Sequence, residues 1–239
     1  HGKGTCQKGG GRIMSSTKNL LAKEFRLAMH PTNIIFLSFA AFLLIPNYPY
    51  YITFFYTGLA LFFTCMNGRE NHDIMYSLNL PVAKKDIVKV RILFATLMEL
   101  LQMIICIPLA LIRLSYKSAD EAGNVVFLSN GAGVNANLTF FALSLMMLGI
   151  FNYVFFVNYY KDVNKVGKAY IIASIIEFLF IGAAEFTIHI PKVAEYFNVF
   201  GKEHIAARLI LFAVGIAVFV LLTFSAYKRS AKEFEVYDI

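Results

Sequence analysis

Residues 138–159, LTFFALSLMMLGIFNYVFFVNY, decide the fold class, because these 22 consecutive residues contain no charged side chain. A helix needs about 20 predominantly apolar residues to cross a hydrocarbon core of roughly 30 Å. The whole chain has the same character, since 58% of its 239 residues are apolar and 15% are charged. Soluble proteins contain about 25% charged residues. The sequence therefore predicts an integral membrane protein.

Five more apolar segments make this an expected all-α protein with six transmembrane helices. The segment 33–45 has only 13 residues, and alone it is typical of a buried or re-entrant helix, although it can be extended to residues 30–49. The connection 46–50 is so short that the first two helices must form a hairpin. The expected spans are residues 33–45, 50–66, 92–112, 138–159, 169–190 and 205–224, and the outer segment 117–137 is expected to be a loop.

The basic residues indicate an orientation. The chain has 22 Lys and Arg against 15 Asp and Glu, a net charge of +7. Of these basic residues, 17 fall in segments on one side of the six expected spans and 5 on the other. Because cytoplasmic loops carry the excess of Lys and Arg, we expect both termini in the cytoplasm. The charge is thus an orientation signal and does not indicate a nucleic-acid surface.

The N-terminal region is expected to contain one interfacial helix. Residues 1–13 are Gly-rich and precede a possible native start at Met14, so we expect them to be disordered or foreign, with residues 14–239 forming a single six-span domain. Residues 17–30 predict an amphipathic helix on the cytoplasmic leaflet, ended by Pro31. Glu24 interrupts its apolar side. A solvated lead-in to the first span is the alternative.

The longest predicted cytoplasmic connection, residues 67–91, carries the most information. Residues 70–78 contain neither Gly nor Pro and place Ile74 and Leu78 one turn apart, which predicts a short amphipathic helix. Pro81 ends this helix, because it lacks an amide donor and restricts Leu80. Basic residues, among them Lys84 and Lys85, then precede the third span.

The order of residues in this connection resembles the coupling region of ABC type-2 exporter permeases. That region has an acidic residue, a short helix, a Leu-Pro step, a small residue, two basic residues and an Ile-Val step. The matching positions here are Glu70, Leu78-Asn79-Leu80-Pro81, Val82-Ala83, Lys84-Lys85 and Ile87-Val88. The family often has Gly or Thr soon after the acidic residue, where this chain has His72 and Asp73. An ordinary basic anchor is the alternative, and it explains the lysines but not the Leu-Pro order.

The resemblance implies a permease subunit of an ATP-driven exporter in the bacterial plasma membrane. Permeases of this size, similar to the phenol-soluble modulin exporters, imply amphipathic or antimicrobial peptides as cargo and a second permease chain, identical or closely related. The chain has no Gly-x-x-x-x-Gly-Lys-Ser/Thr phosphate loop, so ATP and Mg²⁺ would be bound by a separate ATPase subunit, and we expect no directly bound cofactor and no catalytic residues. The implied coupling residues are Glu70, Asp73, Ile74, Leu78, Leu80, Pro81, Lys84 and Lys85.

Three acidic residues lie inside expected spans and are candidates to line a substrate cavity: Glu99, Glu177 and Glu185. Ionisable groups at that depth are costly unless they face protein or water. Glu185 and His189 have helical spacing for zinc, but two ligands without a third do not make a zinc site. A membrane enzyme or a proton-linked carrier using these Glu residues is the alternative function. A scaffold or immunity subunit with the same fold is a third.

Overall fold

The computed structural model describes residues 10–119, 125–200 and 204–237. Within these ranges the chain is almost entirely helical, with one short β-hairpin. The elements are α1 (Gly10–Lys23), a π-helix η1 (Glu24–Ala28), α2 (Thr32–Leu37), a 3₁₀-helix η2 (Ser38–Leu44), α3 (Ile52–Glu70), α4 (Asp73–Leu78), α5 (Lys84–Leu114), β1 (Lys117–Ala119), β2 (Val125–Phe127), α6 (Leu138–Lys161), α7 (Val166–Ile188), α8 (Pro191–Phe197) and α9 (Ile205–Val236).

Four helices of the described chain, α5, α6, α7 and α9, are long and apolar enough to cross a membrane. They correspond to the last four predicted spans, so these four helices are confirmed, and by length and composition they are compatible with a transmembrane protein. The first two predicted spans are also helical, but they are not among these four, and residues 32–44 form only a shorter apolar helix. α2 and α3 are joined by a buried hydrogen bond from Asn33 Nδ2 to Thr64 Oγ1, 2.8 Å long.

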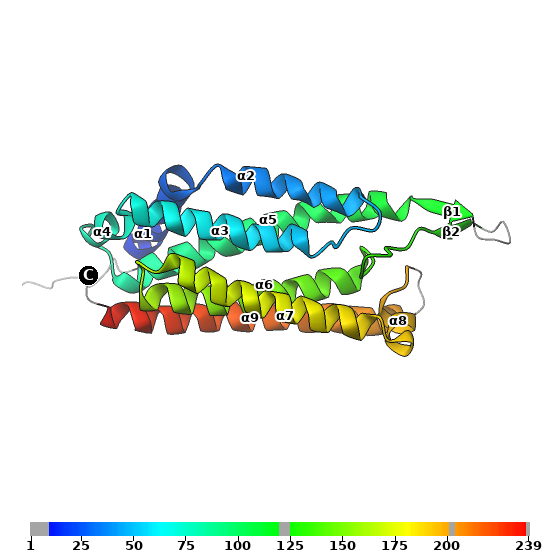
Figure 1. The fold of residues 1–239 in the computed structure, drawn as a ribbon. Coiled ribbons are helices and arrows are strands. Elements are labelled where there is room, and N and C mark those ends of the chain that lie inside the picture. Colours follow the sequence, from blue (N-terminus) through cyan, green and yellow to red (C-terminus); the bar gives the residue numbers. More distant parts are fainter. Residues whose placement is uncertain (1–9, 120–124, 201–203, 238–239) are drawn as a thin grey trace, which may run out of the picture.

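The long helices run side by side in a bundle (Figure 1). α2, α3 and α5 lie together, and α6, α7 and α9 lie beside them, with α6 packed against both α7 and α9. α1, α4 and the end of α9 gather at one end, here called the α4 end, while the β-hairpin and α8 lie at the other, the hairpin end (Figure 1). α6 is mostly buried, whereas α7 and α9 expose much of their apolar surface.

Two glycines allow α6 and α9 to approach closely. A Cβ atom at Gly215 of α9 would lie 2.6 Å from the carbonyl oxygen of Ala142, and one at Gly149 of α6 would lie 3.0 Å from Cα of Phe219. Small residues at such positions let helix backbones pack tightly where no water-driven hydrophobic effect operates between helices. This contact therefore depends on the absence of side chains at both positions.

The structure corrects three local predictions. The helix expected over residues 70–78 starts only at Asp73, because α3 continues to Glu70 and the chain turns through His72, whose φ of 52° is left-handed and interrupts the helix. The segment 117–137, expected to be a loop, begins with an antiparallel hairpin that pairs Lys117 with Phe127. The N-terminal helix expected over 17–30 extends from Gly10 and ends at Ala28. Of residues 1–13, expected to be disordered or foreign, residues 1–9 lie outside the described residues and residues 10–13 belong to α1.

Replacing Gly215 with leucine tests the α6–α9 contact. The new side chain would collide with backbone atoms of α6, so we expect a loss of about 2 kcal/mol or more in stability. Gly182→Leu is the matched control, because a Cβ at Gly182 meets nothing within 4 Å. Thermal unfolding of the purified protein in detergent measures both. Equal stability of the two variants would show that the contact is not tight.

Candidate functional site

The short helix α4 is fixed to the bundle by buried charges centred on Arg91 of α5. Arg91 Nη2 lies 2.5 Å from Oδ2 of Asp73 on α4, and Arg91 Nε lies 2.8 Å from Oε2 of Glu24 on η1. The side chains of Arg91 and Glu24 are only 3% and 2% exposed. One guanidinium group thus connects three elements that are far apart in the sequence.

Lys23 completes this arrangement. Its Nζ lies 2.7 Å from Asp73 Oδ1 and 3.5 Å from Glu24 Oε1, and it donates a hydrogen bond to Ser77 Oγ at 2.6 Å. The Ser77 hydroxyl in turn donates to the main-chain carbonyl of Asp73. We refer to Lys23, Glu24, Asp73, Ser77 and Arg91 as the Arg91 network. Two cations face two carboxylates in it, so the buried charges compensate each other.

Gly68 on α3 leaves space for this network. A Cβ atom there would lie 3.3 Å from Arg91 Nη1 and 3.7 Å from Cβ of Asp73. The guanidinium group therefore occupies the volume that a larger residue at position 68 would need.

The network sets the charge state of Asp73. Burial alone would raise the pKa of this carboxyl, but the charges of Arg91 and Lys23 and their hydrogen bonds outweigh burial and lower the pKa below its ordinary value of 3.8. Asp73 is therefore a carboxylate at neutral pH, which is the form that both cations bind.

A second set of contacts at the α4 end joins the start of α5 to the chain's C-terminal residues. Lys84 Nζ donates to the carbonyl oxygen of Tyr237 at 2.8 Å, and Asn164 Nδ2 lies 3.2 Å from the Tyr237 hydroxyl. Arg69 Nη1 donates to the carbonyl oxygen of Asn164 at 3.1 Å. The α6–α7 connection thereby bridges the end of α3 and the residue that follows α9.

The predicted coupling residues separate into anchored and exposed groups. Asp73 and Ile74 face the bundle, with Asp73 in the Arg91 network and Ile74 buried, whereas Glu70 at the end of α3 is exposed and lies 3.9 Å from Arg69. Leu78, Leu80 and Lys84 are half-buried, while Pro81 and Lys85 are exposed.

The outward face of α4 is formed by residues that sequence analysis had not selected. Met75 and Tyr76 are 47% and 57% exposed, between the buried Ile74 and Ser77. Sequence analysis also missed Lys23, Ser77 and Arg91. The one sequence signal for the Arg91 network was Glu24, because it is an acidic residue on the apolar side of an amphipathic helix.

Two of the three predicted intramembrane carboxyl groups lie in the bundle interior. Glu99 Oε2 accepts a hydrogen bond from Asn152 Nδ2 at 2.8 Å, and this amide also donates to Thr223 Oγ1 at 3.2 Å, so α5, α6 and α9 meet there. Glu177 of α7 is fully buried and close enough to Glu99 for their charges to interact. Its two oxygens have no hydrogen-bond partner within the described part of the chain.

Glu185 lies apart from this pair, at the hairpin end. It accepts a hydrogen bond from the amide of Val134 at 3.3 Å, and His189 Nδ1 lies 3.7 Å from its carboxylate. Within the described ranges no three His, Cys, Asp or Glu residues gather as metal ligands. Glu185, which the sequence predicted as a cavity residue together with Glu177, therefore does not share a site with it.

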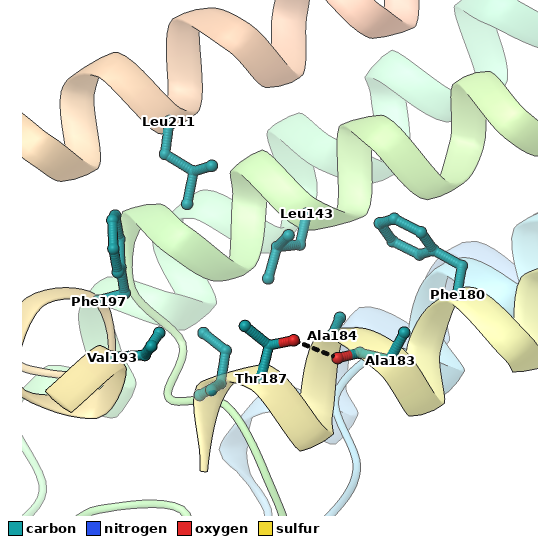
Figure 2. A pocket seen from close by; sticks show the side chains of 9 residues that line it. Leu143, Phe180, Ala183, Ala184, Thr187, Val193, Phe197 and Leu211 are labelled. Carbon is teal, nitrogen blue, oxygen red and sulfur yellow. Dashed lines mark hydrogen bonds between the residues drawn. The ribbon is translucent and has the colours of Figure 1, made fainter. Parts of the chain in front are cut away.

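An apolar hollow of about 320 Å³ lies at the hairpin end, between α6, α7, α8 and α9 (Figure 2). The Thr187 hydroxyl in its lining donates to the carbonyl oxygen of Ala183 at 2.7 Å and is therefore satisfied (Figure 2). None of Glu99, Glu177 and Glu185 lines this hollow. Its lining residues are Leu143, Phe180, Ala183, Ala184, Thr187, Ile188, Val193, Phe197 and Leu211.

No family model, no curated protein and no solved structure matches this chain.

Removing the central cation tests the Arg91 network. Arg91→Ala leaves Glu24 buried without its guanidinium partner and removes one of two partners from Asp73, so we expect a loss of about 3–5 kcal/mol. Lys89→Ala removes an exposed cation from the same helix and should change stability by less than about 0.5 kcal/mol. Denaturant unfolding in detergent measures the stability of both variants. Equal losses of stability would show that the Arg91 network does not stabilise the fold.

The lowered pKa of Asp73 predicts an acid-sensitive attachment of α4. A carboxyl with a lowered pKa stabilises the fold above its unfolded value of 3.8, and this contribution is lost as the pH falls through the folded value. After correction for the intrinsic exchange rate, the amides of residues 76–79 should therefore lose more of their protection against hydrogen exchange than those of α6 below about pH 3.8. Asp73→Asn should lose this extra acid sensitivity. An unchanged acid response in that variant would show that the charge of Asp73 does not attach α4.

Proposed function

We propose that this chain is the permease subunit of an ATP-driven exporter, and that α4 is the helix to which a separate ATPase subunit binds. The observation that carries the proposal is the two-sided character of α4. Its inner side is fixed by the Arg91 network, while Met75 and Tyr76 are exposed on its outer side. A helix that only terminates a loop needs neither feature, whereas a helix that transmits force needs both.

The proposed mechanism follows from how α4 is attached. Movement of α4 by the ATPase passes to α5 through the Asp73–Arg91 ion pair and to the N-terminal helix through Lys23 and Glu24. These elements then move together against the rest of the bundle, as in other transitions where packed helices shift as units. Alternating access of a cleft between two permease chains would result.

The number of spans and their orientation in the membrane are part of the same proposal. The α2–η2 and α3 hairpin supplies the first two of six spans, and the α4 end lies in the cytoplasm of a bacterial cell. The excess of Lys and Arg in the segments at the α4 end supports this orientation. ATP and Mg²⁺ are bound by the partner, the cargo is an amphipathic peptide, and the second permease chain is identical or closely related.

The exposed face of α4 provides the test. In membrane vesicles that contain the chain and its ATPase partner, Met75→Ala/Tyr76→Ala should reduce ATP-driven peptide export at least tenfold, because the gripped surface is lost while the Arg91 network remains. Tyr196→Ala, at an exposed site of α8, is the control and should retain export. Replacing Leu80 or Pro81 should also impair export. Full export by all of the α4-region variants would reject the coupling role.

A proton-linked carrier is a second candidate, and the buried Glu99 and Glu177 favour it. Such a carrier needs no ATPase partner. The purified chain alone in liposomes with an imposed pH gradient distinguishes the two functions. Under our proposal these liposomes do not accumulate peptide, and ATP-driven export with the partner persists when the gradient is collapsed. Gradient-driven transport by the lone chain that is lost in Glu177→Gln would support the carrier instead.

A further inference from the structure

The last turns of α9 form a basic hollow with α6 that the proposed function does not use. It has a volume of about 580 Å³, and its lining includes Lys228, Arg229 and Lys232 of α9 together with Tyr153 of α6. Lys228 and Lys232 are four residues apart and therefore lie on one face of the helix. Three cations converge on a small space at the α4 end of the bundle.

The charge of this hollow is only partly compensated. Glu233 is the one acidic residue in its lining, and its carboxylate lies 3.9 Å from Arg229 Nε with both side chains partly exposed. An exposed ion pair at this distance contributes little attraction. Counting the lining residues, the hollow keeps a net charge of +2, which suits an anion.

Neutral hydrogen-bond donors accompany the cations. Arg229 Nη1 donates to the Tyr153 hydroxyl at 2.9 Å, and because a phenol both accepts and donates, its own proton is free for another acceptor. Ser225, one helical turn before Arg229, also lines the hollow. Hydroxyl and ammonium donors around one space match the oxygens of a phosphate group.

The position of the hollow points to a lipid as the source of that phosphate. α9 has 32 residues and is therefore about 48 Å long, so it exceeds a hydrocarbon core of about 30 Å and its last turns reach the headgroup layer. Val220, Leu221 and Phe224 are 53–64% exposed on the preceding turns. Lys228 Nζ lies 4.6 Å from the Phe224 ring centroid, as when a lysine extends from apolar surface toward headgroups.

We propose that this hollow binds the headgroup phosphate of an anionic phospholipid, with the acyl chains along the exposed apolar residues of α9. Lys228 and Lys232 supply the attraction, and Arg229 and Tyr153 fix the phosphate's position. Basic pockets between membrane helices recognise anionic headgroups in this way. The site depends only on α6 and α9, so it does not require an ATPase partner.

Lipid titration of the detergent-purified protein, followed by native mass spectrometry, tests the site. We expect phosphatidylglycerol to bind more tightly than phosphatidylcholine of the same chain length. Lys228→Gln/Lys232→Gln should weaken phosphatidylglycerol binding roughly 30-fold, since each lysine near a headgroup contributes about 1 kcal/mol. Lys18→Gln/Lys89→Gln, which removes two exposed cations at the same end, is the control and should bind as the unmodified chain does.

Two further arms identify the source of the phosphate and check folding. Inorganic phosphate at millimolar concentration should not displace the lipid, because it lacks the acyl chains. Thermal unfolding without lipid should be the same for both double variants. Equal loss of lipid binding in both variants, equal binding of the two lipids, or displacement by inorganic phosphate would each overturn the proposal.

Discussion

The pairing of Arg91 with Asp73 and Glu24 is the constraint on which the α4 end of the protein depends. α4 has six residues, and a helix of that length is not stable in water without tertiary contacts. Its position is therefore set by the carboxylate of Asp73 and by the burial of Ile74. Because each buried charge is tolerated only while its partners are present, the N-terminal helix, α4 and α5 are constrained to one relative arrangement.

The rest of the bundle is held together differently. α6 and α9 approach closely because Gly149 and Gly215 lack side chains, and the interior contact between Glu99 and Asn152 joins α5 to this pair. The charges of the Arg91 network are concentrated at the α4 end, while the hollow at the hairpin end has an almost wholly apolar lining. Ion pairs thus connect α4 to α5 and to the N-terminal helix, and the Glu99–Asn152 hydrogen bond connects α5 to α6.

The sequence predicted the features that depend on local sequence, and it did not predict those that depend on contacts between distant residues. α5, α6, α7 and α9 were predictable because each is a long apolar run, and span length is a local property. The start of α4 was not, since residues 70–78 contain no Gly or Pro that would signal the left-handed turn at His72. The Arg91 network joins residues up to 67 positions apart, and only its Glu24 left a local signal. Likewise, helical periodicity could not separate Glu185, which lies at the hairpin end, from the buried Glu177.

The claim that α4 is a rigid extension of the bundle is tested most directly by native-state hydrogen exchange of the unmodified protein. Because the Arg91 network fixes Asp73 and Ser77, the amides that are hydrogen-bonded within α4 and at its C-terminal end should exchange as slowly as those in the first turns of α5. This result would support α4 as a helix able to transmit force. Exchange of residues 76–79 at the rate of an unstructured peptide would contradict the account, because a mobile α4 could not pass movement to α5.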